Sequence, residues 1–164
     1  MLKWLTIHII ALCFLPAQDL EMLRNAYKEA GQDDSKIETF EALVNNVSKE
    51  DNTVLVGYKA AALTLKAKLE KTIKSKKSTF IEGRDLLEYA INKTPDNVEL
   101  RFIRLGIQEN TPKILKYKDK IETDKAFLLE HYNAIASQDL KDHITSYIKQ
   151  SKEFTAAEKQ SINL

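Results

Sequence analysis

The segment that most constrains the fold is residues 98–108, which is apolar on two sides when it is drawn as a helix. Apolar residues recur at helical spacing, with Val98, Phe102 and Leu105 on one side and Leu100, Ile103 and Ile107 on the other. A helix that is apolar nearly all round is buried between neighbours, because it has no face for solvent. We therefore predict that residues 98–108 form the central helix of the fold.

A second predicted helix leads into this central helix through a tight turn. Thr79 and Glu82 have the spacing of a capping box, in which the hydroxyl caps one backbone N–H and the carboxylate reaches back to another. Apolar residues then follow at helical spacing: Phe80, Leu87, Ala90 and Ile91. Pro95 cannot continue this helix, and residues 95–97 have turn chemistry. Residues 78–108 are thus predicted to form helix, turn and helix.

The amino-terminal residues have the layout of a secretory signal peptide over residues 1–18. A single lysine supplies the positive charge, residues 4–15 form an apolar run, and Pro16 ends that run before the charged residues begin. The run is shorter than the ~20 residues of a comfortable membrane span. A buried first helix is the alternative interpretation. We expect an exported protein, periplasmic or extracellular, with cleavage near Ala17 or Gln18.

The only cysteine, Cys13, lies inside this apolar run. A lipoprotein would carry its lipid there, but Leu12 is bulky where a small residue is wanted, and the apolar run continues past the cysteine. Removal of the segment leaves a mature chain without cysteine, so disulfides and thiolate chemistry are excluded.

Composition favours an all-α fold. The 164-residue chain contains four glycines and three prolines, and no segment shows the sustained apolar–polar alternation of a strand. Its 25 basic and 24 acidic residues are nearly balanced, which gives no indication of nucleic-acid binding. We predict about seven helices in one domain over residues 19–150, followed by a weakly structured tail over residues 151–164.

The spacing of apolar residues predicts further helices at residues 19–30, 33–47, 53–71 and 139–150. Ser35 and Glu38 form a second candidate capping box, and Asp139 is a candidate cap of the last helix. Residues 75–77 are predicted to be a linker. Small residues at positions 57 and 60–62 would let a neighbouring helix approach closely.

The segment that follows the central helix has two interpretations. Thr111 and Pro112 have the pattern of a cap followed by proline at the first helical position. Residues 112–135 then form either one long helix or two pieces broken near Asp119, and we favour the break.

Two stretches of the chain match each other with a period in the forties. The matched pairs are Ser35 with Thr79, Ile37 with Ile81, Glu38 with Glu82, Asn52 with Asn97 and Leu55 with Leu100. A fixed period over a helix–turn–helix unit is typical of stacked helical hairpins.

At this point the sequence resembles the tetratricopeptide-like families. Residues 87–97 look like the end of such a repeat's second helix, with its alanine at Ala90 and its closing proline at Pro95. The resemblance implies antiparallel helical hairpins stacked in a right-handed α–α superhelix. The tryptophan, leucine–glycine pair and tyrosine of the motif's first helix are not recognisable, so the family's peptide-binding groove is not carried over. The whole chain is also similar to exported helical proteins of Gram-negative bacteria, which implies no activity.

No catalytic, phosphate-binding or dinucleotide motif occurs in the sequence. His131 and His143 each lie three residues after a leucine of an apolar stripe, so both are expected to flank the core. Asp139 and Asp142 lie near His143, but no His-x-x-x-His spacing supports a metal site. We expect neither a catalytic site nor a metal or other cofactor.

Lysines crowd two of the predicted links between helices. They are Lys66, Lys68, Lys71, Lys74, Lys76 and Lys77 in one link and Lys113, Lys116, Lys118 and Lys120 in the other. In a stack of hairpins these two links lie along the same edge, which would then dock an anionic partner. Favourable interaction with helix C-termini and solubility also explain such lysines without any partner.

Two function classes follow from the sequence. The first is a non-catalytic helical-repeat scaffold or adaptor of the cell envelope that binds an unknown protein partner, with membrane contact limited to the signal peptide or to anionic head groups. The second is a small envelope enzyme or ligand-binding protein with an unrecognised site. An apolar surface without converging polar groups favours the first, and a deep pocket with a titratable group of strongly perturbed pKa favours the second.

Overall fold

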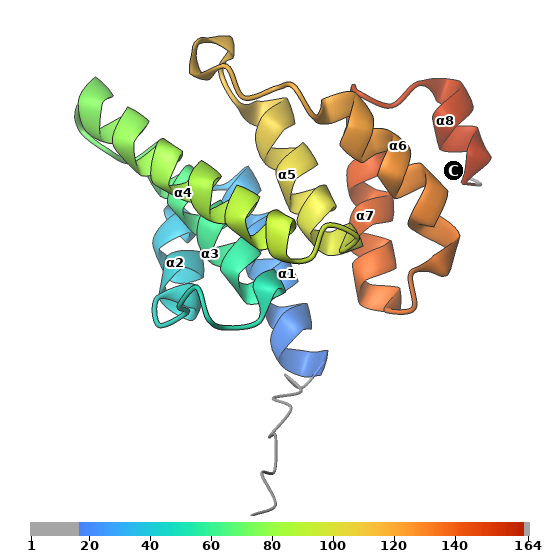
Figure 1. The fold of residues 1–164 in the computed structure, drawn as a ribbon, viewed down its shortest axis with the longest axis horizontal. Helices are drawn as coiled ribbons and strands as arrows, with labels where there is room; N and C mark the ends of the chain where they lie inside the picture. Colours follow the sequence, from blue (N-terminus) through green and yellow to red (C-terminus); the bar gives the residue numbers. More distant parts are fainter. Residues whose placement is uncertain (1–16, 163–164) are drawn as a thin grey trace, which may run out of the picture.

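The structure is a computed structural model that describes residues 17–162, and helices are its only regular elements in that range (Figure 1). The α-helices are α1 (Ala17–Gln32), α2 (Ile37–Val44), α3 (Thr53–Lys66), α4 (Ile73–Lys93), α5 (Val98–Asn110), α6 (Ile121–His131), α7 (Gln138–Gln150) and α8 (Ala156–Ser161). Short 3-10 turns are η1 (Asp34–Lys36), η2 (Lys113–Leu115) and η3 (Tyr132–Ala134). The all-α prediction is confirmed.

Helix α5 lies in the middle of the fold, between the group α1–α4 and the group α6–α8 (Figure 1). Its two apolar sides face two separate hydrophobic cores. Leu100, Ile103 and Ile107 belong to the core shared with α1–α4. Phe102 and Leu105 belong to the core shared with α6–α8. The prediction of a central helix that is buried on two sides is therefore confirmed.

Small residues let α3 pack closely against both α4 and α5. A side chain at Gly57 would collide with Leu100 of α5, and a Cβ at Gly83 of α4 would lie 2.7 Å from the carbonyl oxygen of Ala60. The expectation of a close approach at Gly57 and Ala60 is met, and it places α5 directly on the backbone of α3.

Buried ion pairs add fixed polar contacts to α5. Arg24 of α1 makes a bidentate pair with Glu99, with both N–O distances at 2.8 Å, and its third nitrogen lies 2.8 Å from Asp139 of α7. The hydroxyl of Tyr58 donates to Glu99 at 2.6 Å. Because partners satisfy both charges, burial of this pair is tolerated, whereas removal of one partner would leave an uncompensated charge.

A second set of ion pairs holds the other side of α5. Arg104 contacts Asp124 of α6 through two nitrogens, at 2.6 and 2.7 Å, and Glu88 of α4 at 2.9 Å. Tyr117 donates to the same Glu88 at 2.5 Å. Helix α5 is thus tied by charge to α1, α4, α6 and α7.

The start of α4 differs from the sequence prediction. The helix begins after Thr72, which makes a capping box with Ser75, so Thr79 lies inside the helix and residues 75–77 are helical instead of a linker. Both threonines have suitable spacing. The earlier one becomes the cap because α3 already ends at Lys66, and Lys76 donates to the carbonyl oxygen of Lys68 at 2.6 Å.

The predicted caps of α2 and α7 are also wrong. Asp33, and not Ser35, caps η1 by accepting from the backbone N–H of Ser35 at 2.9 Å, and α2 follows only at Ile37. Ser137 caps α7, because the carboxylate of Asp139 is engaged by Arg24. In each case a neighbouring side chain supplies the cap.

The break predicted near Asp119 is confirmed, because η2 is followed by a loop and α6 begins at Ile121. Thr111 is the C-cap of α5, and Pro112 begins the 3-10 turn, which ends at Lys116 with a φ of 50°. The alternative of one long helix over residues 112–135 is therefore wrong.

The described part of the tail is more ordered than the sequence predicts. Thr155 and Glu158 form a capping box that starts α8, and Glu158 lies 3.2 Å from Lys125 of α6. Phe154 and Ile162, on either side of α8, are buried in the second core. The prediction of a weakly structured tail is wrong for residues 151–162, because two well-placed apolar residues suffice to dock it.

The predicted signal peptide, including Cys13, lies outside the described residues except for positions 17 and 18, which begin α1. None of the helices in the described range is long and apolar enough to cross a membrane. The matched residues Asn52 and Asn97 cap α3 and α5, accepting from the backbone N–H of Val54 and of Leu100. The tetratricopeptide-like superhelical stacking stays a prediction.

Two substitutions test whether α5 supports two cores. Leu100→Ala and Leu105→Ala each remove a side chain with 0% exposure, one from each core. We expect each to lower the free energy of unfolding by about 2–5 kcal/mol, since each leaves a cavity. Met22→Ala, at a position that is 53% exposed, should change it by less than about 0.5 kcal/mol. Chemical denaturation measures all three, and a wild-type midpoint for either leucine variant would contradict the two-core arrangement.

A second pair of substitutions locates the start of α4. Thr72→Ala removes the cap and should destabilise the protein by about 1 kcal/mol. Thr79→Ala lies within the helix and should be neutral or slightly stabilising, because alanine is the best helix former. Thermal melts of the two variants show which threonine caps α4. A lower stability of Thr79→Ala than of Thr72→Ala would indicate that Thr79 is the cap.

Candidate functional site

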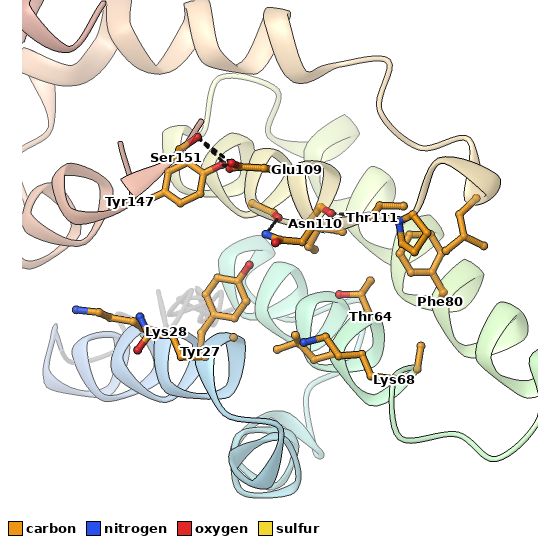
Figure 2. A pocket seen from close by; sticks show the side chains of 18 of the residues that line it. Tyr27, Lys28, Thr64, Lys68, Phe80, Glu109, Asn110, Thr111, Tyr147 and Ser151 are labelled. Atoms are coloured by element: carbon orange, nitrogen blue, oxygen red, sulfur yellow. Dashed lines mark hydrogen bonds between the residues drawn. The ribbon is translucent and has the colours of Figure 1, made fainter. Parts of the chain in front are cut away.

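A cleft of about 980 Å³ opens at one end of the helix bundle. The C-terminal parts of α1, α3, α5 and α7 line it, together with the N-terminal part of α4 and the turn η2. Figure 2 shows side chains from these segments pointing toward one another around the hollow. Six segments that are far apart in the sequence thus form a single concave surface.

The wall of this cleft is mostly apolar. Its aromatic and aliphatic side chains are Tyr27, Leu65, Phe80, Phe102, Ile107, Leu115 and Tyr147. Gly106 contributes a hollow in the wall, because the nearest atom to a Cβ built there is the hydroxyl of Tyr27, at 3.4 Å. Sites of this size and polarity are typical of ligand or partner binding.

Tyr27, His143 and Phe102 form an aromatic cluster at one end of the cleft. The ring centroids of Tyr27 and His143 are 6.4 Å apart in a stacked arrangement, and Phe102 meets His143 edge-on at 5.2 Å. Burial raises the pKa of Tyr27 above its ordinary value. Burial, followed by the charge of Lys28, lowers the pKa of His143. At neutral pH the cluster therefore presents an uncharged imidazole and a protonated phenol.

Glu109 is the only carboxylate among the residues that line the cleft in the described range, and it is already engaged. It accepts hydrogen bonds from the hydroxyls of Tyr147 and Ser151, as Figure 2 shows, and from the backbone N–H of Lys152 at 3.3 Å. Burial, and then the contact with Glu109, raise the pKa of Tyr147. Glu109 consequently holds α7 against α5.

Two isoleucines stand out from the rim of the cleft. Ile73 at the start of α4 and Ile114 in η2 are each 86% exposed, the highest exposure among the large apolar residues described. Single exposed apolar residues are common, but a pair beside an apolar hollow extends the apolar surface past the cleft itself.

The structure brings the two predicted lysine links to the same cleft. Lys76 and Lys77 line it from α4, and Pro112, Ile114 and Leu115 line it from the second link. Lys68 of the first link also lines the cleft, as does Lys28 of α1, which the sequence analysis did not place there. Among residues 17–162, four lysines and one carboxylate thus line the cleft, and Lys68 also pairs with Asp34 at 3.1 Å.

The predicted lysines have unequal surroundings. Lys76 donates to the carbonyl oxygen of Lys68, and Lys118 donates to that of Glu109 at 2.8 Å, so both satisfy helix C-termini. Lys120 lies 3.4 Å from Asp119. The others, Lys71, Lys74, Lys77, Lys113 and Lys116, are exposed and make no ion pair with any described residue.

The second histidine lies elsewhere and packs against neighbouring side chains. His131 stacks on Phe127 at 4.0 Å, its Nδ1 lies 2.9 Å from the carbonyl oxygen of Phe127, and Arg101 lies over the same ring. Within residues 17–162 no cluster of three or more histidine, cysteine or acidic residues could hold a metal ion.

Sequence reasoning missed Tyr27, Gly106 and Glu109 as cleft residues. They come from helices whose ends meet only in the folded protein, and each pattern also fits an ordinary core or helix position. The signal that could have found the cleft is the apolar residue within each lysine link, Ile73 and Ile114.

Comparisons with protein-family models, curated proteins and solved structures give no match.

His143 gives the site a measurable pH dependence. The pKa of His143 is lower in the folded protein than its ordinary value of about 6.5, so below that pH the unfolded state takes up the proton more readily than the folded state. The free energy of unfolding is therefore highest above about pH 6.5, and it decreases as the pH falls through the lower pKa of the folded state. Urea unfolding should therefore show lower stability at about pH 5.5 than at pH 7.5, and His143→Gln should reduce the difference. His131→Gln is the matched control, and equal pH slopes for all three proteins would contradict the assignment.

Proposed function

We propose that this protein is a non-catalytic helical adaptor of the cell envelope that binds another protein through the cleft. The observation that carries the proposal is the apolar hollow of about 980 Å³ with Ile73 and Ile114 exposed at its rim. Contiguous exposed apolar surface of this kind is costly in water unless a partner covers it.

The polar groups of the cleft support binding over catalysis. Catalysis by an activated nucleophile needs a base within hydrogen-bond reach of it. Here His143 has aromatic neighbours, and Glu109 is occupied by Tyr147 and Ser151. Glu109 is therefore already engaged by side chains of the protein itself.

The attachment of the walls supports a preformed binding surface. Arg24 and Glu99 fix α1 to α5, and Glu109 fixes α7 to α5. A rigid site loses little conformational entropy when a partner binds, which favours affinity. The signal-like layout of residues 1–18 supports placement in the envelope.

A small-molecule binding protein is the second candidate. The lowered pKa of His143 within the cleft favours it, because a neutral imidazole in an apolar wall can orient a ligand. The two candidates differ in whether the cleft holds a protein or a small molecule, and one variant that fills the cleft can distinguish them.

The test fills the cleft from its floor. Gly106→Leu places a side chain in the hollow, where only the Tyr27 hydroxyl is near, while Gly106→Ala adds one methyl group. Both substitutions replace a glycine within a helix, so both variants should be at least as stable as wild type. For Gly106→Ala, the free energy of unfolding should rise by up to about 1 kcal/mol. We expect Gly106→Leu to lose proteins captured from envelope extract and Gly106→Ala to retain them. Capture of the same proteins by all three would contradict partner binding at the cleft, whereas loss of a co-purified small molecule alone would favour the second candidate.

A further inference from the structure

We propose that the partner segment held by the cleft is an amphipathic α-helix with acidic residues beside its apolar stripe. The inference rests on the proposed adaptor function and adds the chemistry and conformation of what is bound. It follows from the charge of the walls, the size of the hollow and the position of the two exposed isoleucines.

The charge of the cleft selects an acidic partner. Lys28, Lys68, Lys76 and Lys77 line it, and of these Lys68 already pairs with Asp34 at 3.1 Å. Glu109, the single carboxylate among the described residues that line it, already accepts hydrogen bonds from α7, its C-cap and Lys152. Lys28 and Lys77 come from different walls, α1 and α4, and neither makes an ion pair with another described residue. A segment lying between these walls would meet positive charge on both sides, so acidic side chains on it are complementary.

The size of the hollow fits a short length of helix. A helix with its side chains is about 10–12 Å across and rises about 5.4 Å per turn, so a volume of about 980 Å³ corresponds to roughly two turns. Small-molecule pockets cover a range of about 300–1,000 Å³, and this cleft is at the upper end. A single alkyl chain would leave much of the apolar wall in contact with water.

The rim extends the contact beyond the hollow. Ile73 and Ile114 belong to the two links that border the cleft, and their side chains are almost fully exposed. A helix longer than two turns would cover them, whereas a ligand confined to the hollow would leave both in water. The described residues contain no strand, so they offer no sheet edge to which an extended peptide could add. An apolar helix face laid into a groove is a mode of recognition that suits walls made of helices.

The experiment selects the partner chemistry without assuming a sequence. A display library of random peptides of about 15 residues, near the length at which isolated helices become marginal, is selected on the wild-type protein. Binders that also bind Gly106→Leu are removed. We expect the remaining peptides to carry apolar residues at positions i, i+3, i+4 and i+7 and an excess of glutamate and aspartate. Synthetic versions should gain helical circular dichroism on binding.

Charge variants then test the lysines on the two walls. The double substitution Lys28→Glu, Lys77→Glu should weaken binding of the selected peptides by about tenfold, since it reverses two exposed contacts. The affinity for wild type should also fall as salt is raised. Lys49→Glu is the matched control, because Lys49 is exposed and lies over Tyr89, toward the opposite end of α4 from the cleft. Its affinity should equal that of wild type.

Three outcomes would overturn the inference. Enrichment of basic peptides would contradict the proposed acidic character of the partner segment. Enrichment of peptides without helical periodicity would contradict its helical conformation. Binding of dodecanoate that depends on Gly106, with no peptide enriched, would make the cleft a lipid-anion site. In the first two cases, continued loss of captured proteins by Gly106→Leu would leave the adaptor function standing. Unchanged capture by Gly106→Leu would instead remove the adaptor function itself.

Discussion

The buried pair of Arg24 and Glu99 is the interaction on which the arrangement of helices depends. Charges in an apolar interior are tolerated only when partners satisfy them, and removing one member of such a pair costs about 3–5 kcal/mol. Here Tyr58 and Asp139 complete the set, so one cluster joins α1, α3, α5 and α7. Arg24 precedes the cleft-lining end of α1 and Asp139 lies at the start of α7, so the cluster holds these helices together at a distance from the cleft. The cleft forms where the same helices end.

A second contact decides how wide that end can open. Glu109, in the last turn of α5, accepts hydrogen bonds from Tyr147 of α7 and from Ser151, the C-cap of α7, so the C-terminal end of α7 is held to α5. On the other side, Arg104 holds α4 and α6 through Glu88 and Asp124. The walls of the hollow are consequently fixed by charged contacts that do not belong to its lining, apart from Glu109. The lining itself is free to be apolar.

How far the sequence predicts this molecule depends on whether the determining contacts are local. The two-sided apolar pattern of α5 predicted that the helix is buried on two faces, because that burial is recorded in the residues of one helix. The division of the interior into two cores was not predicted. The start of α4 was not predictable, because Thr72 and Thr79 are both good caps and the choice depends on where α3 ends. The lysine links were found, but not the cleft between them. Its wall combines Tyr27, Gly106 and four helix ends that only tertiary packing brings together.

The hollow at Gly106 is an absent side chain on a helix that the rest of the fold already holds in place. The depth of the hollow therefore depends on the one residue at position 106. Among the described residues, the Tyr27 hydroxyl is the atom that lies near the position that a Cβ would occupy. Alanine or valine there would make the floor shallower in steps while α5 kept its two cores. A change at that one position would therefore alter the shape of the cleft without touching the contacts that place α5 in the fold.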